Sequence, residues 1–104
     1  MRSTVVAVSL SLAALSASAA EFTVTQKDKA FAPGSLKIKV GDSVVFRNED
    51  GFAHNVFSLS DPKSFDLGSY GKGESKTVVF DKPGTVEVEC AIHPNMKMNI
   101  EVAK

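Results

Sequence analysis

The sequence has little cysteine, little histidine and no excess of charge of either sign. Its 104 residues include one cysteine, Cys90, and two histidines, His54 and His93. A single cysteine cannot form a disulfide within its own chain, so no disulfide framework is expected. Twelve basic residues balance twelve acidic ones, which makes nucleic acid and anionic membrane surfaces poor candidates for partners. No hydrophobic stripe with a 3.6-residue period follows the first twenty residues, which argues against amphipathic helices.

The first twenty residues have the features of a secretory signal peptide. A basic residue precedes an apolar run over residues 5–15, and small residues follow at 17–20. The run is shorter than a membrane-spanning helix requires. We expect export to the periplasm with cleavage after Ala20, although cleavage after Ala19 fits equally well. The mature domain would then be residues 21–104, with no membrane anchor, because the signal contains no cysteine for a lipid.

Hydrophobic residues alternate with polar ones along much of the remaining chain, as in half-buried strands. In the clearest example, Leu36, Ile38 and Val40 are expected to point inward between two outward lysines. The order over residues 59–72 is loose, with room for one short strand. The pattern predicts an all-β fold, a Greek-key β-sandwich of seven to eight strands. The expected strands cover residues 21–26, 36–40, 43–48, 52–58, 64–67, 75–80, 85–90 and 97–102.

The lone cysteine lies close to a histidine and to both internal methionines. Cys90, His93 and Met96 fall within seven residues, and Met98 follows. A thiolate, an imidazole and a thioether form a soft ligand set. A second imidazole would complete the trigonal His₂Cys site with a weak axial Met that is typical of electron-transfer copper. His54 is the only other histidine, so the fold would have to bring it to Cys90.

Each of these residues has a more ordinary explanation when it is taken alone. His54 could be a hydrogen-bonded strand histidine, His93 a surface loop residue, and Cys90 a buried, inert thiol. Cys90 shares a strand face with Val86 and Val88, so its sulfur is expected to point into the apolar interior. A thiol there is inert unless a cation holds it as the thiolate. The grouping of all three residue types favours the metal.

The chain resembles the cupredoxin family, in particular plastocyanin, amicyanin and pseudoazurin. The resemblance extends over residues 21–104. It includes Gly-Phe-x-His-Asn at 51–55 and Cys-x-x-His-x-x-Met at 90–96, with a proline directly after the second histidine. It implies a cupredoxin-like sandwich that holds one type 1 copper ion. The ligands implied by the family motif are His54, Cys90, His93 and Met96.

The axial position has two candidates. The register of the last strand aligns Met96 with the axial methionine of the family and leaves Met98 to pack in the core. The spacing in pseudoazurin would select Met98 instead. We expect Met96 to be the axial ligand.

The resemblance also implies a role for the residue after the first histidine. In the family, the residue at the position of Asn55 donates its main-chain amide to the cysteine sulfur, and its side chain ties the two ligand loops together. The family usually has Ser or Thr and then Pro between the cysteine and the histidine, where this chain has Ala91 and Ile92. We therefore expect main-chain groups to form the loop tie. We also expect the Ile92 N–H to donate a second hydrogen bond to the Cys90 sulfur.

The resemblance implies a periplasmic carrier of single electrons that cycles between Cu(II) and Cu(I). The electron would leave through His93, beside an apolar patch of Ala53, Ile92 and Pro94 on which redox proteins dock briefly. The protein would act as a monomer. A periplasmic copper chaperone or storage protein on the same fold is the alternative. An enzyme is not expected, because no spare histidine exists to build a further copper or substrate site.

Overall fold

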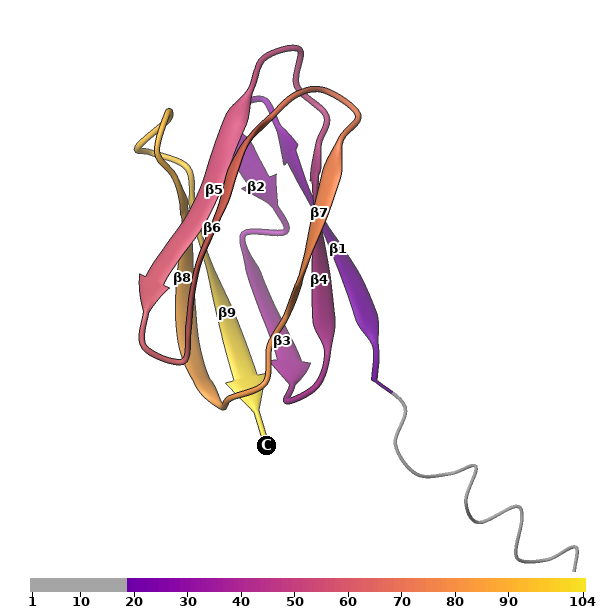
Figure 1. Cartoon of the computed structure of the whole chain (residues 1–104), viewed down its shortest axis with the longest axis vertical. Coiled ribbons are helices and arrows are strands. Elements are labelled where there is room, and N and C mark those ends of the chain that lie inside the picture. The colour runs from indigo at the N-terminus through magenta and orange to yellow at the C-terminus, as the bar shows by residue number, and fades with distance from the viewer. Residues whose placement is uncertain (1–18) are drawn as a thin grey trace, which may run out of the picture.

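The computed structural model describes residues 19–104. These residues form two β-sheets that pack face to face (Figure 1). One sheet has the strand order β2-β1-β4-β7, and the other has the order β3-β9-β8-β5-β6. The predicted all-β sandwich is confirmed, with nine strands in these residues instead of seven to eight. The strands are β1 (Glu21–Lys27), β2 (Ala30–Ala32), β3 (Ser35–Lys39), β4 (Ser43–Asn48), β5 (His54–Ser60), β6 (Lys63–Tyr70), β7 (Ser75–Val79), β8 (Gly84–Cys90) and β9 (Lys97–Ala103).

Side chains from both sheets form one buried cluster between them. As the sequence predicts, β4 buries Val44 and Phe46, and β9 buries Met98, Ile100 and Val102 between exposed residues. Burial of these side chains is the main driving force for the fold. The cluster includes Val24, Val44, Phe46, Val56, Phe80, Val86, Val88 and Ile100.

The predicted signal peptide lies almost wholly outside the described residues. In the part of the chain that is described, no helix is long and apolar enough to cross a membrane.

Three local features differ from the expectations. Strand β2 was not expected, because a three-residue strand with one buried side chain, Phe31, is too short to show alternation. Strand β6 is eight residues long where only a short strand was expected, since Tyr70 is its one buried side chain and the alternation of the first five residues breaks at Gly68. Val40 was expected to point inward, but β3 ends at Lys39 and Val40 is 40% exposed.

Strand β8 carries the cysteine into the interior as predicted. Val86, Val88 and Cys90 are buried, while Glu87 between them is exposed. Cys90 pairs with Val56 of β5, so the end of β8 lies beside the start of β5. The loop from β8 to β9 leaves this point at the end of the sandwich opposite the C-terminus (Figure 1).

Candidate metal centre

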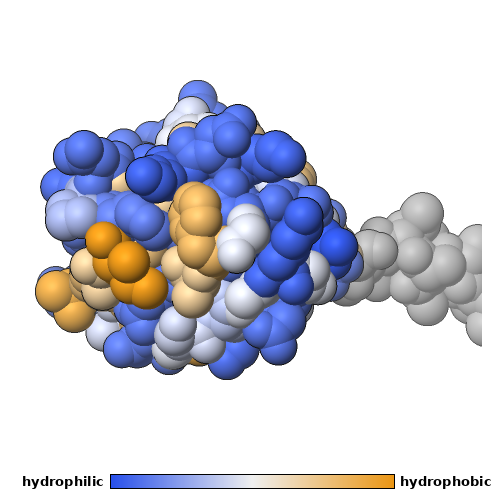
Figure 2. Space-filling view, turned by 90° about the horizontal axis from the view of Figure 1, so that it is seen from above, coloured by the Kyte–Doolittle hydropathy of each residue, from blue (hydrophilic) through white to orange (hydrophobic). Residues whose placement is uncertain are grey.

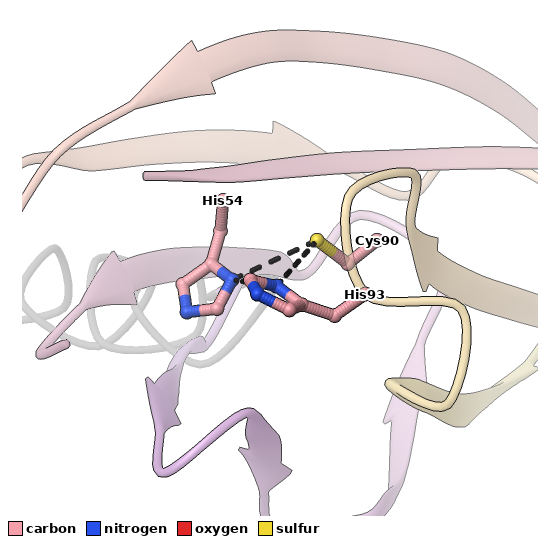
Figure 3. Close-up of side chains that lie close together, drawn as sticks. All are labelled: His54, Cys90 and His93. Atoms are coloured by element: carbon pink, nitrogen blue, oxygen red, sulfur yellow. Dashed lines mark hydrogen bonds between the residues drawn. The ribbon is translucent and has the colours of Figure 1, made fainter. Parts of the chain in front are cut away.

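Two strands and one loop bring a cysteine and two histidines together (Figure 3). His54 begins β5, Cys90 ends β8, and His93 lies in the loop that follows β8. The Cys90 Sγ atom is 3.7 Å from His54 Nδ1 and 3.8 Å from His93 Nδ1. The two Nδ1 atoms are 3.2 Å apart. The structure therefore brings His54 to two residues that lie 36 and 39 positions further along the chain.

The triangle formed by these three atoms has the size of a metal site. The point equidistant from its corners is about 2.1 Å from each, close to the bond lengths of about 2.0–2.3 Å that imidazole nitrogen and thiolate sulfur make to a divalent ion such as zinc. The three residues thus offer one ligand atom each to a single ion. Their soft, trigonal His₂Cys chemistry fits copper.

Met96 is held against the other candidate ligands by its main chain. Its N–H donates to His93 O at 2.8 Å, and its carbonyl accepts from Cys90 N–H at 3.2 Å. Met96 is 1% exposed, so it is buried, and its main chain is hydrogen-bonded to two residues of the triangle. Met98 is also buried, but it lies within β9 opposite Val88. Met96 as the axial ligand stays a prediction.

The expected main-chain contacts of the cysteine are present in part. Asn55 N–H donates to Cys90 Sγ at 3.4 Å, and Ala91 N–H donates to Asn55 O at 3.0 Å. The tie between the two ligand segments is therefore made by main-chain groups, as the alanine at position 91 led us to expect. The second donor expected from Ile92 is not found, since Asn55 provides the only N–H directed at this sulfur within residues 19–104.

A carboxylate that the sequence did not single out binds the far side of His54. Asp50 Oδ2 is 2.7 Å from His54 Nε2, and the His54 side chain is fully buried. Asp50 falls between the strands expected over residues 43–48 and 52–58, and nothing in the local pattern distinguishes it from an exposed turn aspartate. Its role depends on the β1–β2 turn, which meets it only in the folded protein.

The environment of Asp50 stabilises its ionised form. Burial is the largest single influence and opposes ionisation, but hydrogen bonds from His54, Lys29 and Asp28 together outweigh it. The pKa of Asp50 therefore lies below its ordinary value. A carboxylate that accepts several hydrogen bonds remains charged even when it is buried.

Phe52 belongs to the Gly-Phe-x-His-Asn motif, but the sequence did not indicate its place beside both histidines. Its ring centroid lies 5.4 Å from both the His54 and His93 rings, yet 43% of the residue is exposed. Ile92 is 50% exposed. Figure 2 shows hydrophobic side chains gathered on this end of a largely hydrophilic molecule. Phe52 thus extends the expected apolar patch, and the Lys29 amine lies over its ring at 5.9 Å.

A family model of copper binding proteins, the plastocyanin/azurin family, matches residues 18–103. The chain belongs to this family. It is 36% identical to the methylamine utilization protein MauL of Methylorubrum extorquens, over 86% of this chain and 80% of that protein. It is 35% identical to plastocyanin of Ginkgo biloba, over 67% of this chain and 82% of plastocyanin. Membership of this family shows that the cofactor is copper. His54, Cys90 and His93 are positioned to bind one such ion.

Two solved structures support the same fold. A reduced variant of amicyanin is 26% identical, with a TM-score of 0.73, over 86% of this cupredoxin and 88% of amicyanin. The copper-containing nitrite reductase of Thermus scotoductus is 34% identical, with a TM-score of 0.76. The match covers 81% of this chain but 22% of the reductase, so the cupredoxin corresponds to about a fifth of that enzyme.

Proposed function

We propose that this cupredoxin carries single electrons between redox proteins. One type 1 copper ion would be bound by His54, Cys90, His93 and Met96. The observation that carries the proposal is the largely buried triangle of two imidazole nitrogens and one sulfur, which has the size of a site for one metal ion. When bound, copper supplies a Cu(II)/Cu(I) couple, and a trigonal His₂Cys set with a weak axial ligand is typical of electron transfer.

The chain holds its ligand atoms so that they move little when the charge of the centre changes. His54 and Cys90 are fixed by the pairing of β5 with β8. The Cys90 sulfur accepts the Asn55 N–H, and His54 is bound by Asp50. A site with fixed ligands reorganises little on gaining or losing an electron, which favours fast transfer.

The partly buried His93 is the route by which the electron would leave. Phe52 and Ile92 are exposed beside it, as are Ala53 and Pro94. Such a small apolar surface suits transient redox partners, which bind through small interfaces and separate quickly. We propose that the protein acts as a monomer with protein partners of this kind and does not bind nucleic acid.

An enzymatic role is not proposed, although the fold also forms part of a nitrite reductase. Within residues 19–104, one group of three or more potential ligand side chains lies close enough to hold an ion, and both histidines of the sequence belong to it. A copper enzyme with a further catalytic metal would need ligands beyond these.

We propose that residues 1–20 act as a signal peptide and that the domain of residues 21–104 works in the periplasm. One contact bears on the cleavage position: Ala20 N donates to Asp42 Oδ1 at 2.8 Å. Cleavage after Ala19 would turn this nitrogen into an ammonium ion paired with the carboxylate, whereas cleavage after Ala20 would remove it. Mass spectrometry of the exported protein distinguishes the two ends by the mass of one alanine.

The burial of the ligands favours the carrier over a copper chaperone or store. Cys90 is 2% exposed, Met96 is 1% exposed and His54 is fully buried, so an acceptor protein could not easily reach them. A carrier should keep its copper through repeated reduction and oxidation in the presence of a Cu(I) chelator. Transfer of the copper to an acceptor apoprotein within one cycle would favour the chaperone.

The visible spectrum of the oxidised copper protein tests the proposed centre. An intense thiolate-to-Cu(II) band is expected in the wild type and should vanish in Cys90→Ser. Met98→Leu is the matched control, because it also changes a buried sulfur side chain near the end of β8 but should retain the band. A wild-type protein that binds copper without this band would contradict the proposal.

A further inference from the structure

A buried carboxylate lies on the side of His54 that faces away from the ligand triangle. Asp50 Oδ2 is 2.7 Å from His54 Nε2, and the two side chains are 7% and 0% exposed respectively. The ligand set described above requires no carboxylate here, because an uncharged acceptor would also satisfy the Nε2–H. Asp50 is therefore a charged group whose presence the proposed function does not explain.

The carboxylate is fixed by main-chain contacts that do not involve the metal. Asp50 Oδ1 accepts the Asp28 N–H at 2.7 Å, and Oδ2 accepts the Lys29 N–H at 3.1 Å. Asp28 and Lys29 have φ values of 53° and 58°, an unusual pair of left-handed residues. The β1–β2 turn thus presents two adjacent N–H groups to one anion, an arrangement that binds negative charge.

The main chain at Asp50 is held by a second residue, Asn48, which is fully buried. Its Oδ1 accepts the Asp50 N–H at 2.8 Å, and its amide donates to the carbonyls of Phe52 and Tyr70. The segment that leads into His54 is therefore held at several points. The anion is part of the fold whether or not a metal is bound.

We propose that Asp50 is a positioning residue that fixes His54 with its Nδ1 toward the metal and stabilises the oxidised state of the bound copper. The inference rests on the proposed function, since it assumes a copper ion at the triangle. It assigns to Asp50 a role in setting the reduction potential, beyond the four ligands.

The positioning effect follows from hydrogen bonding. An ionised carboxylate only accepts hydrogen bonds, so the ring proton of neutral His54 belongs on Nε2. The lone pair of Nδ1 is then free to face Cys90 and His93. Turning the ring over would break the hydrogen bond between His54 and the buried carboxylate, which is costly. Carboxylates that bind ligand histidines in this way fix the tautomer and the ring orientation.

The electrostatic effect follows from the charge of the ion. Cu(II) carries one more positive charge than Cu(I), so a nearby negative charge stabilises it more. The hydrogen bond to Asp50 also raises the basicity of the ligand imidazole. Solvent screens the interaction only weakly, because Asp50 and His54 are both buried. A neutral residue at position 50 should therefore give a higher reduction potential.

The test is the reduction potential of copper-loaded Asp50→Asn, compared with the wild type by redox titration. Asparagine keeps the size of the side chain and can still accept the Nε2–H, but it carries no charge. We expect the ratio of Cu(II) to Cu(I) affinity to fall about tenfold or more, which raises the potential by about 59 mV or more. A potential that is unchanged or lower would overturn the electrostatic role.

Asp28→Asn is the matched control. The Asp28 side chain is exposed, its contact with Asp50 is made by its main-chain N–H, and asparagine tolerates a positive φ. Like Asp50→Asn, the Asp28→Asn variant loses one negative charge, but this charge is exposed to solvent. We expect its potential to stay close to that of the wild type. An equal rise in both variants would mean that general charge, and not the buried contact, sets the potential.

The tautomer of His54, that is, which ring nitrogen carries the proton, can be measured without a variant and without copper. Nitrogen-15 NMR of the metal-free wild-type protein should show the neutral His54 ring with its proton on Nε2, and a neutral ring with its proton on Nδ1 would overturn the positioning role. This readout also separates the two proposals. Absence of the thiolate-to-Cu(II) band in the wild type rejects the proposed function, whereas the tautomer still decides whether Asp50 positions His54.

Discussion

The main-chain N–H of Asn55 lies 3.4 Å from the Cys90 sulfur and joins the two strands that carry the ligands. A second hydrogen bond joins the same two segments, with the donor on the other one: Ala91 N–H donates to Asn55 O at 3.0 Å. Both contacts are made by main-chain groups, so they depend on the pairing of β5 with β8 and not on particular loop side chains. The environment of the sulfur is thus largely set by the sandwich.

Ile92→Pro tests whether Asn55 is the sole main-chain donor to the sulfur. The observed hydrogen bonds predict a reduction potential close to that of the wild type, because the Ile92 N–H makes no bond to Cys90. A second donor at Ile92, as the sequence suggested, would instead predict a lower potential, since its loss would raise the electron density on the sulfur. Voltammetry of the two proteins under the same conditions decides between these hydrogen-bond patterns.

Separate leucine substitutions of the two methionines test which one is the axial ligand. Met96→Leu should shift the visible spectrum and raise the potential, because a thioether that stabilises Cu(II) is lost. Met98→Leu should leave both unchanged and lower the free energy of unfolding by less than about 1.5 kcal/mol, as expected for a core substitution that nearly conserves volume. Each variant is the control for the other, and the reverse pattern of spectra would assign the axial role to Met98.

The sequence was sufficient for the parts of the site that depend on strand alternation and short spacing. The burial of Cys90 follows from its register with Val86 and Val88. The closeness of Cys90 and His93 follows from the two residues between them. Even Met98 in the core could be predicted, because it alternates with Ile100 along β9.

Contacts between distant segments could not be predicted in this way. Asp50 looks like an ordinary turn residue, and its importance depends on two N–H groups from Asp28 and Lys29 more than twenty positions earlier. Those groups point to it because β2 folds back on β1, and β2 is too short to be recognised from its pattern. Phe52 was read as a strand residue, but its exposure beside both histidines is set by the loop that precedes β5.

Gly84→Ala should destabilise the fold without changing the metal centre. Gly84 has a φ of +136°, and a Cβ atom there would lie 2.6 Å from Pro62 Cγ. We expect the free energy of unfolding to fall by about 1–3 kcal/mol in chemical denaturation. Gly34→Ala is the control, since a Cβ at Gly34 meets nothing within 4 Å. The visible spectrum should stay unchanged, because Gly84 and Cys90 lie at opposite ends of β8.

The stability of the fold at acidic pH should depend on Asp42. In the uncleaved protein, which retains Ala20, the main-chain N–H groups of Ala20 and Lys39 donate to its carboxylate and lower its pKa from the ordinary value of 3.8. A carboxylate with a lowered pKa in the folded state contributes stability above its ordinary pKa, and this contribution is lost as the pH falls toward the folded value. Asp42→Asn should therefore be less stable than the wild type at about pH 6, and the difference should shrink at about pH 3. Urea denaturation at both pH values measures it, with the exposed Asp61→Asn as a control for the loss of one negative charge. A difference that stays constant between the two pH values would show that the hydrogen bonds of Asp42 do not depend on its ionisation.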